Sequence, residues 1–204
     1  MADGFSRVKN GKTVGVFAMQ VGPGAENAYG GVAQAFADSV PILLLPGGHP
    51  SASVGVPPNY ESAKQYQGIT KWSGHVNAVE RIPELMSRAF NQLKTGRRGP
   101  VLLEIPSDIS NSEFPHTGFD YKPVRPFMSE ASSEDIRDLV TAILKASNPV
   151  INAGQGVLYS EATDELVEFS ELTNIPVMTT LAGKSAIPEN HKLALGTGSN
   201  SSTL

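Results

Sequence analysis

The sequence predicts an α/β protein in which parallel strands alternate with helices. Three observations lead to this prediction. Short runs rich in β-branched and aliphatic residues alternate with segments of helical periodicity. One run, 41–45, is apolar throughout, which is typical of a strand covered on both faces. Turns rich in glycine and proline separate the runs, and helices between strands imply right-handed crossovers and a parallel sheet.

The first half of the chain contains three predicted strands and two predicted helices. The strands are expected at 13–18, 41–45 and 100–106, and the first helix at 24–37. Residues 47–68 are rich in Gly, Pro, Ser and Asn and predict an ordered loop. The second helix has the clearest pattern, because its apolar residues share one face: Ile82, Leu85, Met86, Ala89, Phe90 and Leu93.

Periodicity is lost over 107–129, which predicts a linker between domains. This segment also carries three prolines: Pro115, Pro123 and Pro126. We therefore divide the chain into a first domain at 1–110, a linker at 111–130 and the start of a second domain at 131–204.

The second domain begins another α/β series. Strands are expected at 149–153 and 175–179, with a tight turn at 154–156 and a helix at 160–173. In that helix we expect inward-facing Leu166, Phe169 and Leu172. The last residues, 196–204, close no predicted element. An earlier amphipathic helix, which Ser132 or Ser133 would cap, carries five apolar residues on one face: Ile136, Leu139, Val140, Ile143 and Leu144.

Composition narrows the class of protein. The formal net charge is -4 and no strongly basic segment is present, so we expect no nucleic-acid partner. The absence of cysteine excludes disulfides, Cys-ligated zinc and a cysteine nucleophile. No signal peptide is recognisable, and no apolar run approaches the roughly 20 residues that cross a membrane. We expect a cytoplasmic protein without membrane association.

The strongest local candidate for binding is the segment Gly22-Pro23-Gly24-Ala25-Glu26-Asn27, between a predicted strand and a predicted helix. Glycines let a ligand approach the backbone, and ligands of open parallel sheets lie at the carboxyl ends of strands. The alternative is that Gly-Pro-Gly only makes the turn. The segment is neither a P-loop nor a dinucleotide-binding motif, because Asn27 stands where the third glycine belongs. Tyr159 breaks the same motif after Gly154-Gln155-Gly156.

The remaining chemistry-bearing residues give weaker signals. The four histidines are scattered without metal-ligand spacing, so no metal site is expected. His49, just after a predicted strand, is the histidine that could face a site at the carboxyl edge of the sheet. Lys71, beside Trp72, is a second candidate for the substrate side, although a solvated lysine is the simpler interpretation. No Ser/His/Asp arrangement is recognisable.

Several motifs together resemble the acetolactate synthase-like branch of the thiamine-diphosphate enzymes. In chain order they are Val14-Gly15-Val16, Gly22-Pro23-Gly24-Ala25-Glu26-Asn27, Ala35-Phe36-Ala37-Asp38-Ser39-Val40-Pro41, Ile69-Thr70-Lys71-Trp72, Ala89-Phe90, Gly96-Arg97-Arg98-Gly99-Pro100-Val101, Ile105-Pro106-Ser107-Asp108, Leu172-Thr173-Asn174-Ile175-Pro176-Val177 and Gly183-Lys184-Ser185-Ala186-Ile187-Pro188-Glu189. The resemblance implies a flavodoxin-like, truncated pyrimidine-binding domain followed by part of a Rossmann-like middle domain.

The resemblance also implies a cofactor and its ligands. Gly22, Pro23, Gly24 and Asn27 would lie against the aminopyrimidine ring of thiamine diphosphate, between two head-to-tail subunits of a homodimer or homotetramer. The family's activating Glu is expected upstream of Met1, so this chain contains no expected catalytic residue. The family's Mg²⁺ motif is absent as well, and the ion would come from a missing C-terminal domain.

Two features bear on the exact activity. Acetolactate synthases usually show Phe-Gln-Glu in the segment matched here by Asn59-Tyr60-Glu61, which leaves room for a related decarboxylase or carboligase. The middle domains of true synthases often hold a non-reacting flavin, while the same fold without flavin is common. Flavin contacts would fall at four residues: Gly154, Gly156, Thr180 and Leu181.

We therefore expect a fragment of an enzyme that decarboxylates a 2-oxo acid and transfers the remaining two-carbon unit. The isolated chain is expected to be inactive. The alternatives are a non-catalytic module that binds a nucleotide or a partner, and a truncated remnant.

Overall fold

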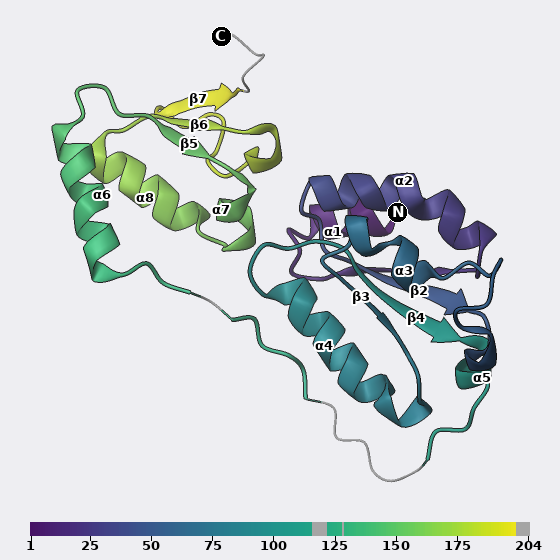
Figure 1. Ribbon diagram of the computed structural model, residues 1–204. Helices are drawn as coiled ribbons and strands as arrows, with labels where there is room; N and C mark the ends of the chain where they lie inside the picture. The colour runs from purple at the N-terminus through teal and green to yellow at the C-terminus, as the bar shows by residue number, and fades with distance from the viewer. Residues whose placement is uncertain (116–121, 128, 199–204) are drawn as a thin grey trace. The chain divides into compact units, whose positions relative to one another are not determined.

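The computed structural model describes residues 1–115, 122–127 and 129–198 (Figure 1). The chain forms two compact units, Met1–Met128 and Ser129–Leu204, which we call unit 1 and unit 2 and describe separately. The division falls within the predicted linker at 111–130. Part of that linker, and most of the predicted unclosed end at 196–204, lie outside the described residues.

Unit 1 contains a four-stranded parallel sheet in the order β1-β2-β4-β3. Its strands are β1 (Gly15–Met19), β2 (Ile42–Gly48), β3 (Trp72–His75) and β4 (Val101–Pro106). The predicted α/β class with a parallel sheet is confirmed. Strand β3 was not predicted, because the short sequence Trp-Ser-Gly-His lacks an apolar alternation and is held in place by its pairing with β4.

The principal helices of unit 1 are those that the sequence predicts: α2 (Pro23–Ala37) and α4 (Ile82–Lys94). Three short helices were not predicted. Helix α1 (Ala2–Val8) precedes the sheet, α3 (Ser62–Gln65) lies in the segment predicted as loop, and α5 (Ser107–Ser110) lies in the segment predicted to lack periodicity. Single 3-10 turns complete the unit: η1 (Ser51–Ser53), η2 (Gln67–Ile69) and η3 (Val79–Arg81).

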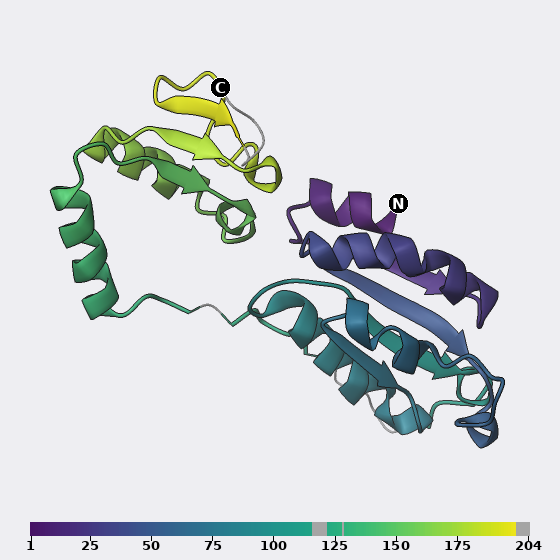
Figure 2. The ribbon, with the colours of Figure 1, turned by 45° about the horizontal axis from the view of Figure 1, so that its top comes forward.

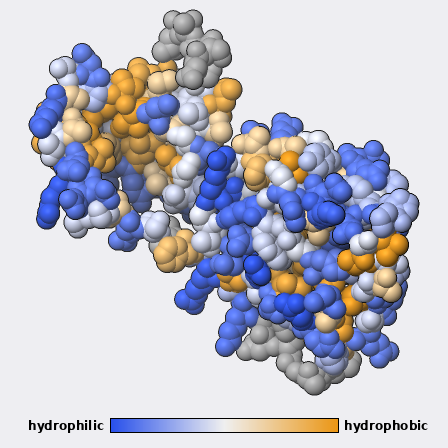
Figure 3. Space-filling model, in the orientation of Figure 1, coloured by the Kyte–Doolittle hydropathy of each residue, from blue (hydrophilic) through white to orange (hydrophobic). Residues whose placement is uncertain are grey.

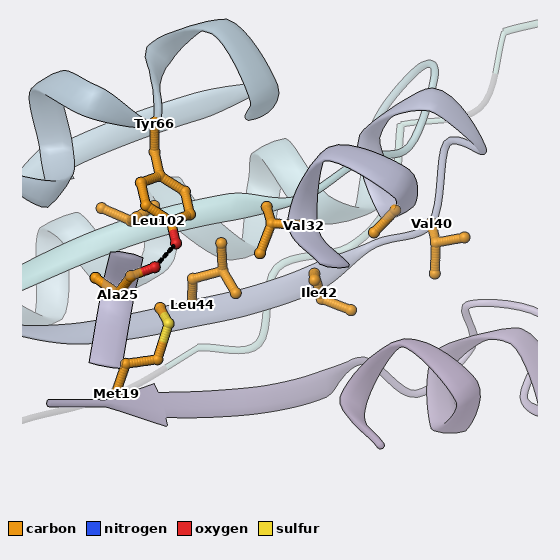
Figure 4. Close-up of a cluster of buried hydrophobic side chains, with 9 residues drawn as sticks. Met19, Ala25, Val32, Val40, Ile42, Leu44, Tyr66 and Leu102 are labelled. Atoms are coloured by element: carbon orange, nitrogen blue, oxygen red, sulfur yellow. Dashed lines mark hydrogen bonds between the residues drawn. The ribbon is translucent and has the colours of Figure 1, made fainter. Parts of the chain in front are cut away.

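Two apolar clusters fix the helices on opposite faces of this sheet, as Figures 1 and 2 show. On one face Leu44 and Leu102 pack with Val32 of α2 and with Tyr66, all of them buried (Figure 4). The Tyr66 hydroxyl donates a hydrogen bond to the Ala25 carbonyl, which ties the 3-10 turn region to the start of α2. On the other face, three residues of α4 are buried against the strands: Leu85, Ala89 and Leu93.

Helix α1 is attached to the sheet by a fully buried hydroxyl. The Oγ of Ser6 donates to the carbonyl oxygen of Pro41 at 2.6 Å and accepts from the backbone N–H of Gly15 at 2.8 Å. The backbones of α1 and β1 approach so closely that a Cβ on Gly15 would come within 2.2 Å of the Ala2 carbonyl oxygen. Gly15 is therefore required by the packing of α1.

Unit 2 contains a three-stranded parallel sheet in the order β5-β6-β7. The strands are β5 (Ile151–Ala153), β6 (Val177–Thr179) and β7 (Ala194–Thr197), the last of which was not predicted. The helices are α6 (Ser133–Lys145), α7 (Gln155–Tyr159) and α8 (Thr163–Thr173), with a 3-10 turn η4 (Leu181–Gly183). The prediction of a tight turn at 154–156 was wrong, because Gly154 is the N-cap of α7.

The inward face predicted for α8 was also wrong in part. Leu166 packs against the sheet, but Phe169 and Leu172 are 38% and 83% exposed. The buried stripe instead runs through Val167 to Ser170, whose Oγ donates to the Ile175 carbonyl oxygen at 2.7 Å. That buried hydrogen bond sets the rotation of the helix on the sheet, and periodicity alone cannot reveal it.

Helix α6 begins with the predicted cap, since the Oγ of Ser132 accepts from the N–H of Asp135 at 3.1 Å. None of its described residues is buried. Figure 3 shows the apolar surface that results in unit 2, to which α6 contributes exposed Ile136, Leu139, Val140 and Leu144. Among the residues that the structure describes, no helix is both long and apolar enough to cross a membrane.

Candidate functional site at the carboxyl edge of the first sheet

The four parallel strands of unit 1 end at one edge of the sheet, to which the arrowheads of β2 and β4 point in Figure 1. Open parallel sheets bind ligands at this carboxyl edge, because helix N-termini and loop backbones gather there. Two features of the structure meet the expectation: the loop after β1 and a pocket beside β3 and β4.

The segment 22–27 after β1, which we call the glycine loop, consists of the N-cap of α2 and the first residues of that helix. Gly22 is the N-cap, with a φ of 66° that glycine adopts without strain, and Pro23 occupies the start of the helix. A Cβ on Gly22 would meet nothing within 4 Å. Asn27 is exposed in the first turns of α2. Gly22 itself is buried, and the N–H groups of Ala25 and Glu26 donate to the carbonyl oxygens of Gln20 and Gly22. The glycine loop therefore presents a helix start whose exposed side chains include the amide of Asn27.

The second feature, which we call the edge pocket, is a cavity of about 540 Å³. Its volume falls in the range of small-molecule sites, which is roughly 300–1,000 Å³. The pocket is lined by the ends of β3 and β4, by α3 and by the loop before it. The polar groups in its lining include His49, Tyr60, Glu61, Lys64, His75 and Glu104.

Glu104 is the most buried of these polar groups, with only 3% of its surface exposed. Its Oε2 accepts a hydrogen bond from the Ala63 N–H at 2.8 Å and lies 3.8 Å from the Nδ1 of His75. Glu104 and His75 are register partners in the paired strands β4 and β3. The carboxylate therefore fastens α3 to the sheet and reaches the pocket together with an imidazole.

Tyr60 connects the pocket with the start of α2. Burial raises the pKa of the Tyr60 phenol, and the nearby carboxylate of Glu26 raises it further. Tyr29 and Glu104 contribute in the same direction. Tyr60 lines the edge pocket and also packs against the apolar cluster that contains Ala25 of the glycine loop, so it adjoins both features.

The two predicted substrate-side residues lie apart. His49 directly follows β2 and lines the edge pocket. Lys71 precedes β3, at the opposite end of that strand, and its Nζ donates to the carbonyl oxygens of Gln92 (2.7 Å) and Thr95. Burial lowers the pKa of Lys71. The structure thus gives Lys71 a part in holding the end of α4 and does not bring it to the pocket.

The residues predicted to contact a flavin gather in unit 2, at the carboxyl ends of β5 and β6. The Thr180 N–H donates to the Ala153 carbonyl oxygen at 3.0 Å, and the Thr180 Oγ1 accepts from the Gly183 N–H at 3.0 Å. Gly183 lies so close to Gly154 that a Cβ on it would come within 2.9 Å of that residue's backbone. Gly156 and Leu181 are exposed at the same edge. The structure therefore brings the four residues into one region.

Sequence reasoning missed Glu104 and His75 as site residues. The signal for Glu104 was a single charge inside the otherwise apolar run Val-Leu-Leu-Glu-Ile-Pro, since a carboxylate in a buried strand needs a partner. His75 gave no usable signal, because it reaches the site only through the pairing of β3 with β4.

Tyr66 behind this site gives a prediction about stability at high pH. Burial raises the pKa of its phenol to about 12, from an ordinary value of 10.0. The unfolded chain releases this proton first, so the stabilisation is complete below pH 10 and is lost as the pH rises toward 12. We expect the free energy of unfolding to decline over this interval, and to decline less in Tyr66→Phe. Urea unfolding at several pH values measures both slopes; equal slopes would contradict the assignment.

Comparison with known families identifies the architecture. The family model described as the N-terminal TPP binding domain of thiamine pyrophosphate enzymes matches residues 1–75, which include the glycine loop. The model for the central domain of thiamine pyrophosphate enzymes matches residues 136–203, in unit 2. The chain belongs to the thiamine pyrophosphate enzyme family. Units 1 and 2 thus carry parts of two successive domains of this family, as the resemblance implied.

Curated relatives of this thiamine pyrophosphate enzyme chain point to one branch of the family. A probable acetolactate synthase large subunit of Methanocaldococcus jannaschii is 36% identical over 96% of the chain. An acetolactate synthase of Arthrospira platensis is also 36% identical, and a glyoxylate carboligase of Escherichia coli O157:H7 is 32% identical, again over 96% of the chain. The chain spans about a third (33–34%) of the length of these relatives. It is acetolactate synthase-like.

The glycine loop fits one end of the cofactor of this family. Thiamine diphosphate carries an aromatic aminopyrimidine, which requires a flat approach and a few directed hydrogen bonds. The exposed amide of Asn27 can both donate and accept. The charged diphosphate end calls for a metal, and the described residues contain no group of three or more His, Asp or Glu residues that could hold one. The exposed Asn27 amide is compatible with the pyrimidine end.

Proposed function

We propose that this chain is the pyrimidine-binding portion, joined to part of the central domain, of an acetolactate synthase-like enzyme. The enzyme would decarboxylate a 2-oxo acid and transfer the remaining two-carbon unit to an acceptor. The observation that carries the proposal is the glycine loop, which opens α2 at the carboxyl edge within the region matched to the TPP binding domain. When bound, the cofactor would supply the electron sink that decarboxylation requires.

The residues of this chain would bind and orient the pyrimidine. Pro23 fixes the start of the helix, Gly24 avoids a collision with the Gln20 Cβ, which a Cβ at this position would approach to 2.8 Å, and the exposed Asn27 amide would supply a directed hydrogen bond. Tyr60, which lines the edge pocket and packs against the cluster containing Ala25, would form a wall between cofactor and substrate. The activating carboxylate, the Mg²⁺ ion and the groups that hold it would be contributed by parts of the enzyme other than this chain.

The proposal also covers the oligomeric state of the enzyme, its location in the cell and a flavin. We infer a homodimer or homotetramer of the whole enzyme, because the pyrimidine site needs a facing diphosphate site, and we retain the expectation of a cytoplasmic protein. A flavin in unit 2 would contact Gly156 and Leu181, which are exposed at the end of β5 and β6. The support for a flavin is weaker, because Thr180 and Gly154 already contact Gly183.

Binding of thiamine to the isolated chain tests the proposal. We expect free thiamine, which carries the pyrimidine without the diphosphate, to shift the amide resonances of the glycine loop in NMR spectra. Asn27→Ala should weaken this binding about fivefold to tenfold, since one directed hydrogen bond is worth roughly 1 kcal/mol. Asn91→Ala, an exposed asparagine on α4 at the opposite face of the sheet, is the matched control and should leave binding unchanged.

Two outcomes would contradict the proposal. Thiamine that shifts resonances elsewhere, or equally in both variants, would remove the glycine loop from the pyrimidine site. Turnover of pyruvate by the isolated chain would refute the part of the proposal that assigns the activating carboxylate and the metal to other parts of the enzyme.

A further inference from the structure

The edge pocket contains the buried carboxylate of Glu104, of which only one oxygen accepts a hydrogen bond from the part of the chain that the structure describes. The Oε2 of Glu104 is bound to the Ala63 N–H, at 2.8 Å. The Oε1 lies over the backbone of Gly48, where a Cβ would come within 3.1 Å of it. Among the described residues, no donor forms a hydrogen bond to this second oxygen. This oxygen is not among the buried polar atoms that lack a partner, so it is an acceptor that the edge pocket leaves accessible on an otherwise buried side chain.

The charges around Glu104 decide which ligand this oxygen favours. From α3 and the loop before it, Lys64 and Glu61 line the pocket; from the strand ends, His75 and His49 do. Glu61 is occupied by the Gly55 N–H, at 3.1 Å. Besides the two imidazoles, the lining contains two carboxylates and one ammonium group. A ligand carboxylate beside Glu104 would therefore meet a like charge at low dielectric, whereas a hydroxyl group would meet an acceptor.

We propose that the edge pocket binds the acceptor substrate and selects an uncharged, hydroxyl-bearing carbonyl compound over a second 2-oxo acid. The Oε1 of Glu104 accepts a hydrogen bond from the substrate hydroxyl, and the Ala63 N–H holds the carboxylate in the orientation that leaves this oxygen free. This assignment deepens the proposed function and rests on it, since an acceptor implies carboligation.

Two small probes with the same carbon skeleton test this selectivity. Hydroxyacetone carries a hydroxymethyl group where pyruvate carries its carboxylate. In NMR titrations of the 204-residue chain, we expect hydroxyacetone to shift the resonances of Ala63, Ser73 and His75. We expect pyruvate to bind at least about tenfold more weakly, because one charge-assisted hydrogen bond is replaced by a like-charge contact. Equal affinities, or tighter binding of pyruvate, would overturn the proposal.

Glu104→Gln reverses the chemistry of the pocket in a predictable way. Only the side-chain carbonyl of Gln can accept from the Ala63 N–H, so the amide NH₂ group must occupy the position of Oε1. We expect hydroxyacetone to bind about tenfold more weakly in this variant and pyruvate to bind more tightly than in the wild type. The matched control is Asp108→Asn, an exposed carboxylate at the same edge that accepts from the Ser51 N–H at 3.0 Å and does not line the pocket.

A second variant keeps the test decisive if Glu104→Gln does not fold. Gly48→Ala places a methyl group against the Oε1 of Glu104 and should weaken hydroxyacetone binding without changing the charge. Unchanged probe preference in a folded variant of either kind would overturn the assignment of Glu104. Failure of both probes to bind, with thiamine still bound at the glycine loop, would refute the acceptor site alone; loss of thiamine binding would refute the proposed function instead.

Discussion

Leu44→Ala is expected to lower the free energy of unfolding of unit 1 by about 2–5 kcal/mol, the range measured for buried leucines. Leu44 is fully buried in β2 and packs between α2 and Tyr66 (Figure 4). Its strand is paired on both sides, with β1 and with β4, so the backbone cannot move inward to fill the cavity. The loss therefore combines the transfer free energy of the side chain with an unrelaxed cavity.

The single tryptophan of the chain makes this measurement specific for unit 1. Trp72 lies in β3 and packs in the cluster between the sheet and α4, with the guanidinium of Arg88 at 5.2 Å from its ring centroid. Its fluorescence during urea unfolding reports unit 1 independently of unit 2. Val8→Ala, at an 82% exposed position of α1, is the control and should change stability by less than about 0.5 kcal/mol. Similar losses in the two variants would show that Leu44 is not packed as described.

Gly15→Ala is expected to destabilise unit 1 by about 1–3 kcal/mol, the cost of forcing extra volume into a packed site. The added Cβ would lie within 2.2 Å of a backbone oxygen in α1, which cannot rotate away as a flexible side chain can. Helix α1 must shift, and the shift breaks the hydrogen bond from the Gly15 N–H to the Ser6 Oγ. Urea unfolding followed by Trp72 fluorescence measures the loss.

The same chemical change has the opposite sign elsewhere in unit 1. Gly31 lies in the middle of α2, is exposed, and would place a Cβ in open space. Gly31→Ala should stabilise the unit by about 0.5–1 kcal/mol, because alanine loses less backbone entropy in a helix. A stabilising effect of Gly15→Ala, or a loss at Gly31 as large as that at Gly15, would contradict the packing of α1 on β1.

The alternation of strands and helices, and the place of the glycine loop between β1 and α2, could be predicted from the sequence. The apolar run at 41–45 and the single-faced pattern of α4 result from burial, which leaves a periodic trace in the chain. The strand, the glycine loop and the helix from 15 to 37 follow one another directly along the chain, so their order could be predicted from consecutive residues. The family resemblance rested on the same local motifs and is confirmed by the domain matches.

The edge pocket was decided by tertiary structure. Strand β3 is short and its sequence has no apolar alternation, so the strand forms only because it pairs with β4. The same pairing brings His75 beside Glu104. The same pairing places Lys71 at the opposite end of the strand from the pocket, where its Nζ donates to the Gln92 carbonyl oxygen. Residues at the two ends of one short strand thus reach opposite edges of the sheet. Which side chains meet across the sheet depends on strand order and register, and a single sequence does not specify either.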